Sequence, residues 1–149
     1  MTRQVQDAYI VAATRTPIGK APKGVFRNVR PDDLLVAAIR NAMSQVPTLD
    51  PKAVEDAIIG CAMPEAEQGL NMARIAVLLA GLPNTTGGMT INRFCSSGLN
   101  AVAIAADRIR VGEADVMIAG GAESMSMVPM TGYHIAPNPT LALEHPVIV

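Results

Sequence analysis

Short apolar runs alternate along the chain with polar stretches that are rich in proline and glycine. Four of these runs have the length of β-strands and are predicted as strands at residues 8–13, 56–61, 89–94 and 115–119. A run without alternation of apolar and polar residues is typical of a parallel strand that is covered on both faces. The spacing of the runs leaves room for a helix between successive strands.

Two helices are predicted from start and stop signals. Pro31, followed by two acidic residues, opens one helix that ends before Pro47. Asn71 caps the second helix, and Gly81 stops it. The predicted apolar face of this second helix comprises Met72, Ile75, Ala76 and Leu79.

A third helix is predicted at residues 96–111. From residue 99 to residue 109 it is almost entirely aliphatic, which predicts a helix buried on nearly all sides. The order of strands and helices predicts a layered α/β fold with a mostly parallel sheet flanked by helices.

The character of the sequence changes after Gly121. Residues 124–130 hold three methionines, several prolines follow, and no clean periodicity remains. We therefore expect an α/β domain at residues 1–121 and the start of a loop region at 122–149. The apolar end of the sequence is interpreted as a sign of truncation.

Composition narrows the class of protein. The chain has 149 residues, of which 50% are hydrophobic and 17% are charged, with a formal net charge of −1. It has no basic run of the kind that binds nucleic acid, no apolar run long enough to span a membrane, and no recognisable signal peptide. The sequence predicts a globular, cytoplasmic protein that binds neither nucleic acid nor a membrane.

Of the two cysteines, Cys95 is the candidate nucleophile. It falls where a predicted strand ends and a helix begins, so unpaired N–H groups and the helix dipole favour its thiolate. Two serines and Gly98 follow it, which leaves room for a substrate at the sulfur. A small buried hydrophobe is the alternative interpretation of Cys95, and the one preferred for Cys61, which has no charge partner beside it in the sequence. The spacing of the two cysteines fits no metal site.

Four ordered motifs extend this interpretation. They are ATRTPIG at residues 13–19, QGLNMAR at 68–74, TINRFCSSGLNA at 90–101 and GGAESMS at 120–126. Together they resemble the N-terminal portion of thiolases, with Cys95 in the place of the nucleophile. Within that family the sequence is most similar to degradative 3-ketoacyl-CoA thiolases, which are acetyl-CoA C-acyltransferases of fatty acid β-oxidation.

The resemblance implies a fold, a reaction and substrates. The fold would be the first half of a five-layer αβαβα sandwich. The reaction would cleave a 3-ketoacyl-CoA with CoA through an acyl-cysteine on Cys95, whose backbone N–H would also bind the thioester oxygen, or run in reverse. Acyl-CoA and CoA are substrates here, so the resemblance implies no cofactor.

The family's downstream histidine, cysteine and asparagine motifs do not occur in this sequence, and His134 and His145 are interpreted as loop histidines. We therefore expect little or no turnover from these 149 residues alone. The resemblance also implies a homodimer or homotetramer, with the segment from Met89 to Phe94 at the dimer interface. Two alternatives remain open, namely a non-catalytic assembly subunit or fragment of a thiolase-fold protein, and a redox sensor that acts through Cys95.

Overall fold

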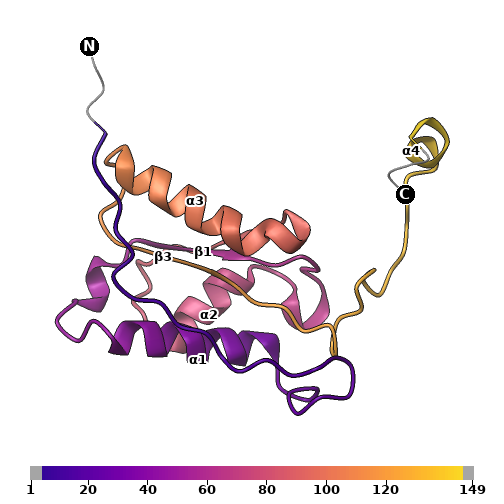
Figure 1. Ribbon diagram of the computed structural model, residues 1–149, viewed down its shortest axis with the longest axis horizontal. Coiled ribbons are helices and arrows are strands. Elements are labelled where there is room, and N and C mark those ends of the chain that lie inside the picture. The colour runs from indigo at the N-terminus through magenta and orange to yellow at the C-terminus, as the bar shows by residue number, and fades with distance from the viewer. Residues whose placement is uncertain (1–4, 146–149) are drawn as a thin grey trace.

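The computed structural model describes residues 5–145, which form a three-stranded parallel sheet with helices on both faces (Figure 1). The strands are β1 (Asp56–Gly60), β2 (Met89–Ile91) and β3 (Met117–Gly121). Their order is β2-β1-β3, and β1 pairs in parallel with both neighbours. The predicted α/β class with a parallel sheet is confirmed.

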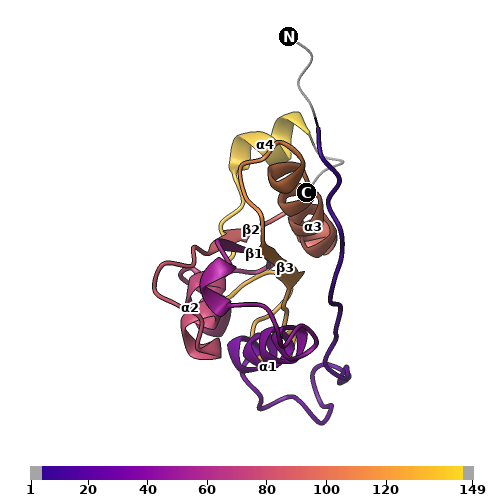
Figure 2. The same cartoon turned by 90° about the vertical axis from the view of Figure 1, so that its left-hand side faces the viewer.

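The helices divide into two layers. The pair α1 (Pro31–Ser44) and α2 (Met72–Ala80) packs on one face of the sheet, and α3 (Ser97–Arg110) packs on the other (Figures 1 and 2). Side chains of β1 alternate between the layers, because Ile59 belongs to the cluster with α1 and α2 while Ile58 belongs to the cluster with α3. Both isoleucines are fully buried, as expected for a central parallel strand.

The predicted signals set the ends of α2. The Asn71 side chain accepts a hydrogen bond from the N–H of Arg74 at 3.2 Å, and Gly81 ends the helix with φ 90°. The predicted apolar face is partly wrong, because Leu79 is 49% exposed while Ala73 and Val77 are fully buried. The buried face is rotated because α2 packs against α1 as well as against the sheet.

No strand forms at residues 8–13, so this prediction is wrong. The segment passes from α3 to α1 (Figure 2), and its hydrogen bonds join it to helices rather than to the sheet. Gln6 donates to the carbonyl groups of α3 at one end, and Gln45 binds the backbone of Ala13 at the other. Tyr9, Ile10 and Val11 are therefore 71–79% exposed. An apolar run reports a preference for burial, but it does not supply the backbone partner that a strand needs.

The helix α3 is buried on one face only, which corrects the expectation of near-complete burial. Ser97, Ala101 and Ala105 are the buried residues, four positions apart, whereas Leu99 is 76% exposed. This spacing places a single stripe against the sheet, and among residues 5–145 no second layer covers the opposite face.

The strand predicted at residues 89–94 is also shorter than expected. It stops at Ile91, which pairs with Gly60 at the end of β1, and three residues later the chain turns at Phe94 with φ 49°. Beyond β3 the described chain contains one further helix, α4 (Pro139–Glu144), which stands apart from the sheet (Figure 1).

Candidate active site

Cys95 lies in a single turn of 3-10 helix, η3 (Phe94–Ser96), that leads directly into α3. Its thiol is free and exposed. The position therefore agrees with a cysteine at a helix start. The turn's two hydrogen bonds are donated by the backbone N–H groups of Ser96 and Ser97, so the N–H of Cys95 takes part in neither.

Two polar side chains hold this turn in shape. The Asn92 carboxamide accepts from the N–H of Phe94 at 2.8 Å and donates to the carbonyl of Ala62 at 2.9 Å. The Ser97 hydroxyl accepts from the N–H of Arg93 at 2.8 Å and donates to the carbonyl of Phe94 at 2.6 Å. Together they stabilise the left-handed backbone at Phe94, a conformation that is unfavourable for a residue with a large side chain.

Glycines let the start of α3 approach the ends of the strands. A Cβ atom at Gly60 would lie 2.4 Å from the carbonyl carbon of Ser97, well inside van der Waals contact. A Cβ atom at Gly121 would lie 3.2 Å from the carbonyl oxygen of Gly60 and 3.4 Å from Cα of Gly98. The carboxyl ends of β1 and β3 therefore form the base on which the Cys95 turn sits.

An open pocket of about 550 Å³ lies at this edge of the sheet. The segments that follow β1 and β3 form its walls together with the Cys95 turn. Its lining residues are Gly60, Ala62, Met63, Phe94, Cys95, Ser97, Gly98, Gly121, Ala122, Glu123, Met125 and Met130. Three methionines make the walls largely apolar and adaptable in shape. The pocket can therefore take a flexible aliphatic group next to a thiol.

Cys61 is buried, in contrast to the exposed Cys95. It is 1% exposed and belongs to the core between the sheet and the α1–α2 layer. Burial, and secondly the negative charge of Glu123, raise the pKa of its thiol to about 11. Cys61 is a packing residue, as predicted. The fold nevertheless gives it a charged neighbour that the sequence did not show, since its sulfur lies 4.0 Å from Glu123 Oε1.

Gln68 and Glu123 belong to two of the four sequence motifs, but the sequence predicted no role for either residue. In the structure, Glu123 Oε2 accepts from the N–H of Ala62 at 2.6 Å, and Oε1 accepts from Gln68 Nε2 at 2.5 Å. Gln68 is fully buried, donates to the carbonyl of Met63 at 2.7 Å, and accepts from the N–H of Ser124. A polar residue that the fold buries completely is the relevant signal, and it becomes visible only once the fold is known.

Comparison with known proteins shows the family of the chain. The sequence pattern of the family described as "Thiolase, N-terminal domain" matches residues 8–144, which is nearly the whole chain. The chain belongs to the thiolase N-terminal domain family.

Individual thiolases support the assignment. The chain is 51% identical to the 3-ketoacyl-CoA thiolase of Bacillus subtilis over 142 residues, which cover 95% of this chain and 36% of that protein. It is 43% identical to the 3-ketoacyl-CoA thiolase of Saccharophagus degradans over 141 residues, with 95% and 36% covered. The chain thus spans about a third of the length of these relatives.

Solved thiolase structures share the fold. The Bacillus anthracis acetyl-CoA acetyltransferase superimposes with a TM-score of 0.78 at 38% identity, covering 84% of this chain and 31% of that one. The Acat5 thiolase of Ascaris suum, solved in complex with coenzyme A, gives a TM-score of 0.76 at 30% identity, with 87% and 35% covered. The predicted family and fold are confirmed.

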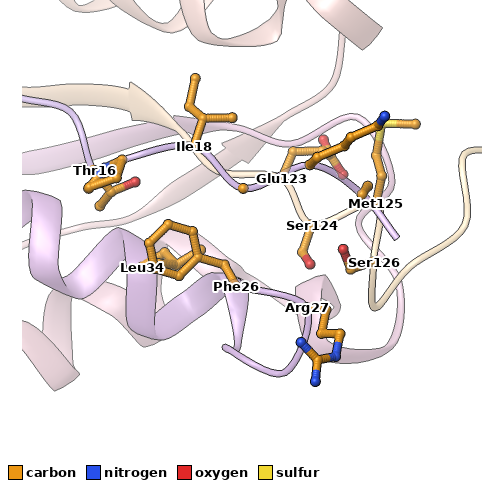
Figure 3. Close-up of a pocket in the computed structure, with 13 residues that line it drawn as sticks. Thr16, Ile18, Phe26, Arg27, Leu34, Glu123, Ser124, Met125 and Ser126 are labelled. Carbon is orange, nitrogen blue, oxygen red and sulfur yellow. The ribbon is translucent and has the colours of Figure 1, made fainter. Parts of the chain in front are cut away.

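A second cavity, smaller than the Cys95 pocket, has a volume of about 140 Å³ (Figure 3). It lies between the loop that precedes α1, which contributes Phe26 and Arg27, and the segment from Glu123 to Ser126. Glu123 lines both cavities, so the segment after β3 forms a shared wall.

The histidines of the chain do not line the Cys95 pocket. His134 and His145 are both exposed. Across residues 5–145, no group of three or more histidine, cysteine or acidic side chains is placed to hold a metal ion. Within the same residues, no helix has both the length and the apolar character needed to cross a membrane.

Proposed function

We propose that the protein is an acyltransferase of the 3-ketoacyl-CoA thiolase type, with Cys95 as its nucleophile. One observation carries the proposal: an exposed thiol stands in a largely apolar pocket at the carboxyl edge of a parallel sheet. Its support comes from the 51% identity to a 3-ketoacyl-CoA thiolase across 95% of the chain. By the same resemblance, the reaction belongs to fatty acid β-oxidation.

The proposed reaction has two acyl transfers. The Cys95 sulfur attacks C3 of a 3-ketoacyl-CoA, a bond forms between sulfur and carbon, and the bond between C2 and C3 breaks. The electron pair remains on C2, which takes up a proton to give acetyl-CoA. The thiolate of a second CoA then attacks the acyl-cysteine carbonyl, forms the shortened acyl-CoA, and returns the sulfur to Cys95.

The Cys95 turn supplies a donor for the acyl intermediate. An oxyanion is stabilised by preorganised N–H groups that are not engaged elsewhere. The N–H of Cys95 donates neither of the two hydrogen bonds that define its turn, which leaves it suited to the thioester oxygen. The resemblance to thiolases implies this role for the backbone N–H of Cys95, and the hydrogen bonding of the turn is compatible with it.

Glu123 is the other titratable residue among those that line the pocket, but we do not assign it as the base. Both of its carboxylate oxygens already accept hydrogen bonds, from Ala62 and from Gln68. The base and the proton donor are instead assigned to the histidine, cysteine and asparagine motifs that the family carries further along its sequence. The full cycle therefore requires more than these 149 residues.

Two further predictions from the family remain proposals. The first is the division into a domain at residues 1–121 and a loop region from 122 onward. The second is a dimer, or a dimer of dimers, formed through the segment from Met89 to Phe94. In support of the second, β2 is an edge strand whose outer side is unpaired within the described chain.

The deciding experiment is the intact and peptide-mapped mass of the complete native protein after incubation with acetyl-CoA. We expect one acetyl group, located on Cys95, and none on Cys61, which serves as an internal control because its thiol is buried and protonated. A Cys95→Ser variant should lose the acetyl group. An unmodified wild-type Cys95 would refute the proposal and favour the non-catalytic assembly subunit.

A further inference from the structure

Two loops that form walls of the Cys95 pocket, one after β1 and one after β3, both bind the buried side chain of Gln68. The loop after β1 contributes Ala62 and Met63, and the loop after β3 contributes Glu123 and Met125. Beyond the last paired residues of the strands, a single backbone hydrogen bond joins these segments, from Ala122 to Gly60 at 3.1 Å. The other hydrogen bonds between these two segments involve the side chains of Gln68 and Glu123.

We propose that Gln68, acting through Glu123, is a positioning residue that sets the shape of the acyl-binding pocket. We call the pair the Gln68–Glu123 clamp. The inference rests on the proposed acyl transfer to Cys95, and it assigns a role to two residues that do not carry the chemistry.

The hydrogen bonds of Gln68 leave it a single orientation. Its Nε2 has two hydrogens, and these are used by the carbonyl of Met63 at 2.7 Å and by Glu123 Oε1 at 2.5 Å. Its Oε1 accepts from the N–H of Ser124. Rotating the carboxamide by 180° would set oxygen against oxygen at both acceptors, so the network defines which atom is nitrogen.

This orientation ties both walls to the same carboxamide. Met63 belongs to one wall and Glu123 to the other, and Ser124 follows Glu123 directly in the chain. Glu123 adds a direct bond between the walls through the N–H of Ala62 at 2.6 Å. Gln68 is fully buried and so is its hydrogen bond with the N–H of Ser124, so loss of the carboxamide would leave that N–H without this acceptor away from solvent.

The Gln68–Glu123 clamp requires a side chain at residue 68 that both donates and accepts hydrogen bonds. In Gln68→Glu the side chain keeps its shape but loses both N–H donors, and it faces the carboxylate of Glu123 and the carbonyl of Met63. In Gln68→Met the length is kept, and the hydrogen bonds with Met63, Glu123 and Ser124 are lost together with the 3.5 Å contact between Nε2 and the Cys61 sulfur. In the reciprocal variant, Gln68→Glu with Glu123→Gln, residue 123 can again donate to residue 68, while the bond to Met63 stays broken.

The test uses the complete protein and two reactions of the same thiol. Iodoacetamide is small and needs only an exposed Cys95, whereas acetyl-CoA must also fit between the walls. For Gln68→Met we expect the kcat/KM of Cys95 acetylation to fall by roughly tenfold to a hundredfold, as for an active-site displacement of about 1 Å. The alkylation rate should stay within about twofold. Gln45→Met, the same change at an exposed glutamine bound to Ala13, is the matched control and should alter neither rate.

Rescue distinguishes the clamp from a general loss of packing. The reciprocal variant should acetylate at least about fivefold faster than Gln68→Glu alone, since it restores the bond between the two residues. If Gln68→Met does not fold, the single Glu123→Gln variant tests the inference instead. Its carboxamide keeps one of the two oxygen acceptors of Glu123, and we expect acetylation of Cys95 to slow by at least about threefold.

Three results would overturn the inference: acetylation of Gln68→Met at the wild-type rate, an equal fall in both reactions, or absence of rescue in the reciprocal variant. Failure of the underlying proposal would look different. In that case the wild-type protein itself would carry no acetyl group on Cys95.

Discussion

The contact between Gly60 and the start of α3 makes a sharp prediction about how Cys95 is held. In Gly60→Ala the new methyl group would lie 2.4 Å from the carbonyl carbon of Ser97 and 2.5 Å from the nitrogen of Gly98. Both atoms belong to the backbone, so no side chain can rotate to make room. The start of α3 must move by about 1 Å to restore an ordinary contact of 3.4 Å.

The displacement has two consequences of known size. Overpacking a core contact typically costs about 1–3 kcal/mol of folding free energy. Because Cys95 precedes Ser97 by two residues in the same turn, it moves with the helix start. A shift of about 1 Å at a reacting atom costs on the order of a hundredfold in rate. We expect Gly60→Ala to lose both stability and acetylation of Cys95.

Gly98→Ala is the matched control, because it makes the same change in α3 at the residue that follows Ser97. Its Cβ would lie 3.9 Å from the carbonyl oxygen of Gly120 and 4.0 Å from Cα of Gly121, both ordinary distances. Replacing glycine by alanine in a helix contributes up to about 1 kcal/mol. Urea denaturation of the complete protein should therefore show opposite signs for the two variants. Equal stability of Gly60→Ala and wild type, with normal acetylation, would refute the close-contact reasoning.

Two other measurements test the structure directly. The pKa of the Cys61 thiol is raised to about 11 in the folded state, from a value near 9.0 in the unfolded state. The thiol therefore stays protonated to a higher pH in the folded state than in the unfolded state. The contribution of this thiol to the free energy of unfolding is fully present below pH 9. As the pH rises from 9 to 11, that free energy falls by about 2–3 kcal/mol. Urea midpoints at pH 8.5 and pH 10.5 check this, and Cys61→Ala should remove that part of the slope; an unchanged slope in the variant would contradict it. Asn71→Ala removes the α2 cap and should cost about 1 kcal/mol, measured the same way, whereas a loss below about 0.3 kcal/mol would show that the cap contributes nothing.

The elements with strong local signals could be predicted from the sequence. The Asn71 cap, the Gly81 stop and the buried run of β1 each follow from a residue type whose physical preference is local. The predicted strand at residues 8–13 failed because pairing depends on a partner elsewhere in the chain. The predicted burial of α3 failed because a count of aliphatic residues says nothing about how many layers cover them.

The site divides in the same way. The position of Cys95 directly before a helix could be predicted from the local sequence, whereas its role as the nucleophile stays a prediction. The Gln68–Glu123 clamp could not be predicted, because its two residues are 55 positions apart and neither is unusual in its local sequence. Only the parallel pairing of β1 with β3 brings the loops that carry them together. Contacts of this kind require the fold before they can be inferred.

Phe94 precedes Cys95 in a left-handed conformation, with φ 49°, and it lines the Cys95 pocket. For a residue other than glycine this conformation costs about 1–2 kcal/mol, and glycine would avoid most of that cost. Glycine would also remove the aromatic wall. Stability and pocket shape are thus in conflict at residue 94, and evolution or engineering cannot optimise one there without giving up part of the other.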